Sequence, residues 1–322
     1  MEAENLLQVF QKSLFSDLPD PESFPAVRPL IAHYTSLECF EQMLRTQEVW
    51  FSNPLFMNDL QEVRFGIEEA MHMFHDGAVL EACGTEERFL KLSESLDHVY
   101  RAFADDEVLD TYIFCTSRHA PGKHDDGLLS MWRGYGGNGK GVAVVFDTKV
   151  LGDVPESPLI ISRVVYASTE DRKGWLRELI AKFAVLIAQE KPPTDLMYLC
   201  AHVLFQRIKL FALFTKHDGF TEEEEWRVAY IRDRDTTASL HRMFSYSVGK
   251  QGVVPRLKLK IMPIPGATGP DFSLSKVIHK IILGPGISGP LNRAVVARML
   301  QHRGFPELKE RLSGSTIPFD CA

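Results

Sequence analysis

The sequence has few cysteines for its length and no C-x-x-C pair. Its 322 residues contain five, at scattered positions: Cys39, Cys83, Cys115, Cys200 and Cys321. An odd number of cysteines without regular spacing excludes a disulfide scaffold. We expect free thiols in a reducing compartment.

Long apolar runs are also missing. The longest uninterrupted one, residues 183–188, is far below the roughly 20 residues that span a bilayer. The N-terminal residues, which include Glu2 and Glu4, do not have the basic and apolar regions of a signal peptide. The sequence therefore predicts a cytoplasmic protein that does not associate with membranes.

The sequence has no excess of basic residues. It has 36 Lys and Arg against 43 Asp and Glu, a net charge of −7. Proteins that bind nucleic acid show a basic stripe, so this balance disfavours nucleic acid as a partner, although a local basic groove would be compatible with it. The 45% of apolar residues exclude a disordered chain.

The pattern of apolar residues predicts an α+β protein. Continuous or β-branched runs indicate strands at 30–34, 49–52, 111–115, 142–146, 227–231 and 276–283. Helical spacing indicates helices at 4–15, 37–45, 60–110, 172–190, 195–214 and 290–303. Because the strands do not alternate strictly with helices, we expect a mixed, largely antiparallel sheet.

Domain organisation follows from the same pattern. Four prolines between residues 16 and 29 indicate an extended connector after the first helix. We therefore divide the chain into residues 1–29, a helix and connector, and residues 30–322, a single α+β domain. Helical insertions are expected at about 60–110 and 172–214.

Two glycine motifs and two groups that contain histidine give only weak evidence for a nucleotide or metal site. Gly141 stands where a P-loop needs Ser or Thr, so the sequence does not predict a P-loop. Residues 284–289 lack the later acidic strand of a dinucleotide fold, and we interpret them as a strand-to-helix turn, with a helix N-terminus that holds a phosphate group as the alternative. His119, His124, Asp125 and Asp126, and likewise His72 and His75, lack metal-site spacing. We expect solvated side chains there and predict no metal.

Three polar clusters follow predicted strands: His33-Tyr34-Thr35-Ser36, Phe114-Cys115-Thr116-Ser117 and Glu223-Glu224-Glu225-Trp226-Arg227. Each has a structural explanation; for example, Thr35-x-x-Glu38 fits a helix capping box. Their order along the chain nevertheless resembles that of the ADP-ribosyltransferase superfamily.

That resemblance implies NAD as the substrate. His33 would bind the ribose, Glu225 would contact its 2′-hydroxyl, and Glu223 would orient the acceptor. Breaking the nicotinamide–ribose bond builds positive charge on the sugar, which a preplaced carboxylate stabilises. The other expected contacts to NAD are Tyr34, Thr35, Ser52, Asn58, Ser117, Trp132, Tyr135 and Arg227.

A second resemblance extends from about residue 30 to 286. The sequence is similar to the bacterial family known as domain of unknown function 2971. The similarity rests on the three clusters and on three further segments: Trp50-Phe51-Ser52-Asn53-Pro54, Met57-Asn58-Asp59 and Ser130-Met131-Trp132-Arg133-Gly134-Tyr135. Its members resemble accessory bacterial proteins of phage defence or toxin systems.

The leading hypothesis is therefore an NAD-dependent ADP-ribosyltransferase or NAD glycohydrolase of a bacterial defence or toxin type. A small nucleotide would be its ligand, and the acceptor stays open. One alternative is a non-catalytic sensor that binds a nucleotide or a peptide. Another is a nuclease or phosphodiesterase that holds a metal with Asn58, Asp59 and Glu62.

Overall fold

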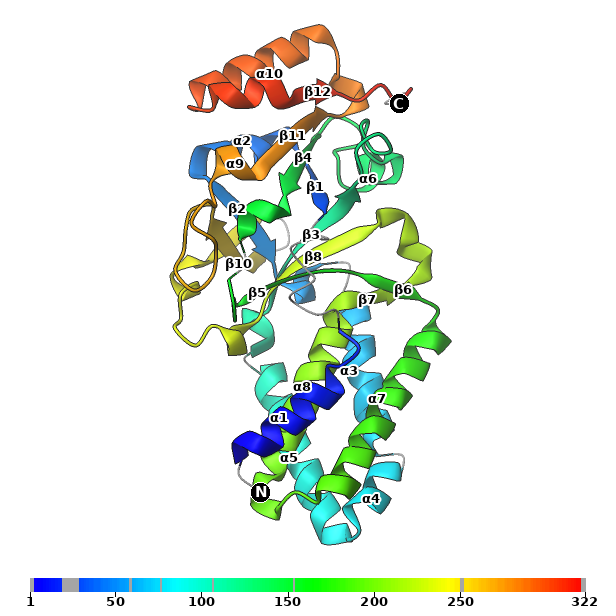
Figure 1. Cartoon of the computed structure of the whole chain (residues 1–322). Coiled ribbons are helices and arrows are strands. Elements are labelled where there is room, and N and C mark those ends of the chain that lie inside the picture. Colours follow the sequence, from blue (N-terminus) through cyan, green and yellow to red (C-terminus); the bar gives the residue numbers. More distant parts are fainter. Residues whose placement is uncertain are drawn as a thin grey trace. The chain divides into compact units, whose positions relative to one another are not determined.

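The computed structural model of the chain describes residues 3–18, 29–57, 60–75, 77–105, 107–152, 154–249 and 252–319. The chain forms two compact units, each assembled from three separate segments (Figure 1). Unit 1 contains Met1–Pro21, Pro54–Thr111 and Val164–Gly219, and unit 2 contains Glu22–Asn53, Tyr112–Arg163 and Phe220–Ala322.

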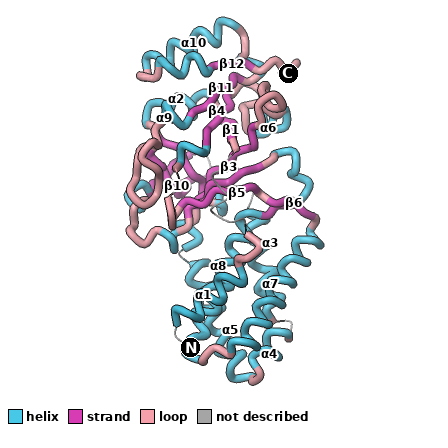
Figure 2. The backbone as a smooth tube through the Cα atoms, viewed as in Figure 1, coloured by secondary structure: helices cyan, strands magenta, loops and turns pink. Residues whose placement is uncertain are grey.

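Unit 1 is almost entirely helical (Figure 2). Its helices are α1 (Ala3–Leu14), α3 (Leu60–Phe74), α4 (Ala78–Cys83), α5 (Glu86–Asp105), α7 (Thr169–Glu190) and α8 (Met197–Phe214). Two short parallel strands, β6 (Val165–Ala167) and β7 (Thr215–His217), complete it. Helices thus occupy both ranges in which helical insertions were expected.

Helix α8 is the central helix of unit 1, because α1, α3 and α5 all pack against it. With the turn before it, Thr194–Phe214 is long and apolar enough to cross a membrane by length and composition alone. However, 67% of its apolar window is buried inside the protein. A core helix of a soluble protein has these same properties.

Unit 2 is built around a large sheet. Its strands are β1 (Leu30–Thr35), β2 (Glu48–Ser52), β3 (Tyr112–His119), β4 (Val142–Asp147), β5 (Leu159–Arg163), β8 (Glu225–Tyr230), β9 (Phe244–Gly249), β10 (Gly252–Lys260), β11 (Ile278–Leu283) and β12 (Leu312–Gly314). Its helices are α2 (Leu37–Thr46), α6 (Leu129–Gly134), α9 (Leu274–Val277) and α10 (Pro290–His302).

The sheet is mostly antiparallel. Its main order is β12-β11-β4-β1-β3-β2-β10-β9, and β8 lies between β3 and β5. Among the described strands of this sheet, only β11 and β12 pair in parallel. The predicted α+β class with a mixed, largely antiparallel sheet is therefore confirmed.

Alternation of side chains gives the sheet two different faces. Ile31 points into the larger apolar cluster, which also contains Phe114 and Val228, and we call this side the core face. Ala32 and Tyr34 point to the opposite side, where Met131 and Trp132 of α6 cover them, and we call this side the α6 face.

Strand β3 is the centre of the sheet, and its neighbours change along its length. Its C-terminal half pairs with β1 through three positions that end at Ala32 and Ser117, whereas Ser52 of β2 pairs with Ile113. Along its other edge it pairs with β8 from Tyr112 to Ser117. The backbone pairing between β1 and β3 therefore stops in the middle of the sheet.

Candidate functional site

The structure brings together the second and third polar clusters on the α6 face. Ser117 is directly opposite Ala32 of β1 on one side and Glu225 of β8 on the other. Residues that pair in this way project to the same face. The Ser117 side chain is fully buried, and its hydroxyl has no hydrogen-bond partner in the part of the chain that the structure describes.

Glu225 is held by Arg227, two residues further along β8 on the same face. The guanidinium donates from Nε to Glu225 Oε1 at 2.7 Å and from Nη2 to Oε2 at 3.0 Å. Exposure is 4% for Glu225 and 0% for Arg227. A forked pair of this kind fixes the orientation of the carboxylate.

The two preceding glutamates have partners from other segments. Tyr135, just after α6, donates from its hydroxyl to Glu223 Oε1 at 3.2 Å. Lys123 donates to Glu224 Oε1 at 2.7 Å. Burial raises the pKa of Glu224, but the hydrogen bond from Lys123 and the nearby charges outweigh it, so that this pKa lies below its usual range. Glu223, Glu224 and Glu225 therefore each have a side-chain partner in the structure.

His33 lies at the place where β1 and β3 separate. Its Nδ1 is 3.0 Å from the Cys115 carbonyl oxygen, and its ring centroid is 4.5 Å from that of Phe114. Because His33 follows Ala32, its ring projects to the core face, opposite to Ser117 and Glu225. Burial lowers the pKa of His33 below its ordinary value. The structure therefore does not bring His33 and Glu225 around one ligand.

Tyr34 and Trp132 form the covered part of the α6 face. Their ring centroids are 4.9 Å apart, and Trp132 is fully buried. The Tyr34 hydroxyl accepts a hydrogen bond from the Leu128 amide at 2.8 Å, and burial raises the pKa of Tyr34 to about 12. Both rings are thus occupied by protein contacts. Thr35, the next residue after Tyr34, is buried. The N-cap of α2 is Ser36 rather than Thr35.

The remaining expected contacts lie at different places. Ser52, at the end of β2, projects to the α6 face and accepts a hydrogen bond from Arg256 of β10. Asn58 and Asp59 lie outside the described residues. Glu62, the third expected metal ligand, forms an ion pair with Arg172 at 2.6 Å in unit 1. No group of three His, Cys, Asp or Glu residues in the described ranges is placed to hold a metal.

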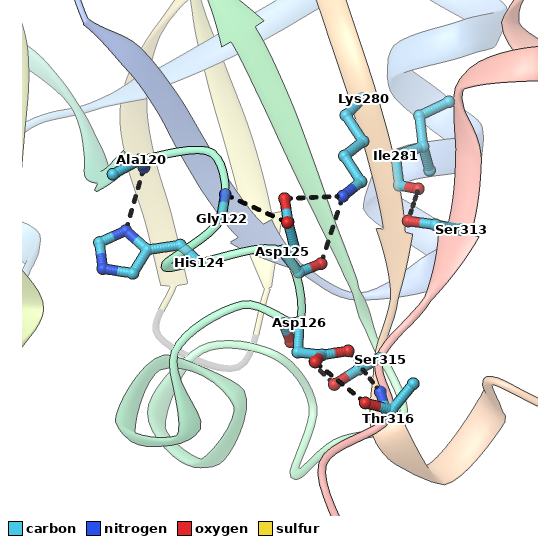
Figure 3. A network of polar contacts seen from close by, with 10 residues as sticks. All are labelled: Ala120, Gly122, His124, Asp125, Asp126, Lys280, Ile281, Ser313, Ser315 and Thr316. Atoms are coloured by element: carbon cyan, nitrogen blue, oxygen red, sulfur yellow. Dashed lines mark hydrogen bonds and ion pairs between the residues drawn. The ribbon is translucent and has the colours of Figure 1, made fainter.

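Residues 120–127 form a structured loop that sequence reasoning treated as solvated (Figure 3). Asp125 pairs with Lys280 of β11 at 3.3 Å. Asp126 accepts hydrogen bonds from the Thr316 amide at 2.6 Å and from the Thr316 hydroxyl at 2.9 Å. This aspartate thereby fixes the segment that follows β12. No local pattern indicates the contact, because 190 residues separate its partners.

The two glycine-rich motifs meet at one end of the sheet. The Gly284 amide donates to Gly141 O at 2.9 Å, and the Gly286 amide donates to Gly139 O at 2.8 Å. A Cβ atom on Gly141 would lie 2.2 Å from the Thr35 carbonyl oxygen. The glycines therefore allow close packing between these backbone segments.

The described part of unit 2 also contains an apolar cavity of about 40 Å³ on the core face. Phe51, Phe114, Phe146 and Phe272 line it together with aliphatic side chains. Its walls offer no charged group to a phosphate or a ribose, so the cavity does not fit a nucleotide.

Comparison with known proteins identifies one family. Residues 131–228 match the family described as protein of unknown function, DUF2971. This match bears out the predicted resemblance to that family over these residues. Neither the curated proteins nor the solved structures contain a match to the chain.

Proposed function

We propose that this chain, which carries the DUF2971 family segment at residues 131–228, cleaves NAD between nicotinamide and ribose, as an ADP-ribosyltransferase or a glycohydrolase. The observation that supports this proposal most is the pairing of Ser117 with Glu225 on one face of the sheet. The hydroxyl would bind the substrate, and the carboxylate would stabilise the ribosyl cation.

The chemistry needs a fixed negative charge beside the sugar. When the bond between C1′ and the nicotinamide nitrogen breaks, its electron pair goes to nicotinamide and leaves positive charge on the ribose. Glu225, whose orientation Arg227 fixes, would supply the negative charge that stabilises it. The oxygen of water or of an acceptor then bonds to C1′ and loses its proton to solvent.

In this proposal His33 has a structural role, because its ring fills the gap between β1 and β3 on the core face. Glu223 and Tyr135, which hydrogen bond to each other, are the groups proposed to orient the acceptor. A bacterial defence or toxin role and a cytoplasmic location stay predictions.

A second candidate is a module that binds a nucleotide without cleaving it. The observation that favours it is the fork between Arg227 and both carboxylate oxygens of Glu225, which is also the geometry of a structural ion pair. In that case the Ser117 hydroxyl would bind the ligand, and Glu225 would only support β8.

Nicotinamide release from NAD, followed by mass spectrometry with and without cell lysate, tests the proposal. The decisive variants are Ser117→Ala and Glu225→Gln. Because the Ser117 hydroxyl lacks a partner among the described residues, its removal leaves the fold intact. Ser95→Ala is the matched control, since Ser95 is also buried but donates to Lys91 O within α5.

We expect the wild type and Ser95→Ala to release nicotinamide, and Glu225→Gln to bind NAD while losing about 10²–10³-fold in turnover. NAD binding without release by any protein, abolished by Ser117→Ala, would support the binding module instead. Full activity of Glu225→Gln would show that the carboxylate is not catalytic.

A further inference from the structure

Strand β9 forms an exposed edge of the sheet in unit 2. It pairs with β10 along one side, and no other strand among the described residues pairs with it. Along its six residues, the backbone groups of alternate residues point away from β10 and offer a template for another strand. Natural edges of this length are usually blocked by a charged residue, a proline or a bulge. Residues 244–249 contain no charged residue and no proline.

One face of this hairpin exposes apolar side chains. Tyr246 is 67% exposed and Val248 is 83% exposed, and Val253 of β10, directly opposite Val248, is 60% exposed. These three residues share the core face of the sheet, beyond the end of the apolar cluster. Clustered exposed apolar side chains on an open edge indicate a binding surface.

The other face carries positive charge that reaches over β9. The Arg256 Nε donates to the Ser247 hydroxyl at 3.3 Å, and Lys258 Nζ lies 3.5 Å from the Tyr246 carbonyl oxygen. Both cations start on β10 and contact β9, while Arg256 also donates to Ser52 of β2 and Lys258 Nζ lies 4.4 Å from the centroid of the Trp50 ring. They are therefore close to any side chain that an added strand would place beside Ser247.

The charge of the surrounding sequence has one sign. Residues 236–270 contain five Lys or Arg and no Asp or Glu, in a chain with a net charge of −7. Pairing of β9 with β9 of a second copy would place two such stretches side by side, and like charges would oppose it. An acidic occupant fits this edge best.

From these observations we infer that β9 is a docking edge for an extended segment of a partner protein, in which apolar and acidic residues alternate. Its backbone would continue the sheet. Its apolar side chains would pack on Tyr246 and Val248, and its carboxylates would lie beside Ser247 and meet Arg256 and Lys258. This surface is separate from the residues of the proposed NAD chemistry.

Fluorescence anisotropy with two labelled nine-residue peptides tests the inference. One peptide alternates valine with glutamate and the other alternates valine with lysine. We expect the full chain to bind the glutamate peptide at least about tenfold more tightly, which corresponds to about 1.4 kcal/mol. Neither measurement involves NAD, so its outcome is independent of the proposed catalytic activity.

Two variants locate the binding. Val248→Lys puts a charge on the apolar face, and Ser247→Glu puts a carboxylate where the peptide would place its own. Each should weaken the glutamate peptide about tenfold or more. Leu291→Lys, which changes a 76% exposed residue of α10, is the matched control and should leave binding unchanged.

Several results would overturn the inference. These are equal binding of the two peptides, no binding of the glutamate peptide at about 1 mM, and full binding by both β9 variants. A dimer that Val248→Lys converts to monomer in sedimentation experiments would assign the edge to a second copy. Binding of a labelled single-stranded oligonucleotide that Lys258→Gln abolishes, without any peptide binding, would assign it to nucleic acid.

Discussion

Glu225 and Arg227 lie two residues apart on β8, and the guanidinium of Arg227 reaches both carboxylate oxygens of Glu225 at 2.7 and 3.0 Å. Both side chains are nearly or fully buried. Because water cannot replace a lost partner at such a site, the pair couples the candidate catalytic carboxylate to the stability of the sheet.

Removal of the guanidinium should therefore be costly. We expect Arg227→Met, which keeps most of the side-chain volume, to lower the free energy of unfolding by about 3–5 kcal/mol in urea denaturation. Arg163→Met, at the exposed end of the adjacent strand β5, should change it by less than about 0.5 kcal/mol. Equal effects of the two substitutions would contradict a buried pair.

Gly141 should tolerate no side chain. A Cβ atom there would lie 2.2 Å from the Thr35 carbonyl oxygen and 2.7 Å from that of Gly136, and backbone cannot move aside easily. We expect Gly141→Ala to destabilise the protein by at least about 3 kcal/mol. Gly134→Ala meets nothing within 4 Å at the end of α6, so its thermal midpoint should be unchanged or raised.

Asp126 should control the segment after β12. Its carboxylate accepts from both the amide and the hydroxyl of Thr316. We expect Asp126→Ala to speed hydrogen exchange at the Thr316 amide by at least about tenfold, since charged hydrogen bonds contribute about 1.5–3 kcal/mol each. Asp125→Ala removes the contact with Lys280 and should leave that rate unchanged. Equal rates in wild type and Asp126→Ala would refute this role.

Stability should decrease as the pH falls from 7 to 5, and His119 should contribute. Burial, together with Lys280 and His124, lowers its pKa from 6.5 to about 4. The unfolded chain therefore binds a proton in this interval that the folded chain does not, and unfolding becomes easier. The loss is about 2 kcal/mol between pH 7 and pH 5.

Urea denaturation at pH 5, 6 and 7 measures this dependence. Asp125 and His279 also face His119, and Asp125 has a pKa below its usual range, so it stays charged over the interval. We expect His119→Gln to reduce the loss of stability between pH 7 and pH 5. His33 has a lowered pKa for the same reason and should account for part of what is left. An identical slope in the variant would exclude His119.

Sequence patterns predicted the parts of the fold that depend on local order. The apolar run of β4 and the helical spacing of α7 and α8 correspond to elements in the structure. The hairpin of β9 and β10 had no prediction, although residues 256–260 alternate strictly between basic and apolar side chains. That alternation was the available signal.

The candidate site was harder to predict, because strand pairing decides which clusters meet. Ser117 and Glu225 share a face as a result of the register between β3 and β8. The register between β1 and β3 separates His33 from them, since Ala32 is opposite Ser117 and one position along β1 reverses the face. The spacing of residues in one sequence does not specify how strands are aligned. From the order of the clusters alone we therefore expected all three residues in one cleft.

The position of β1 in the sheet has a consequence during synthesis. Both of its partners, β3 and β4, follow it in the chain, and β4 begins 107 residues after β1 ends. At about 5–20 residues per second, β1 waits roughly 5–20 s on the ribosome for its second neighbour. Until β3 and then β4 have been made, Ile31 and Ala32 have no complete sheet to enter, so these apolar residues of the nascent chain are open to a chaperone.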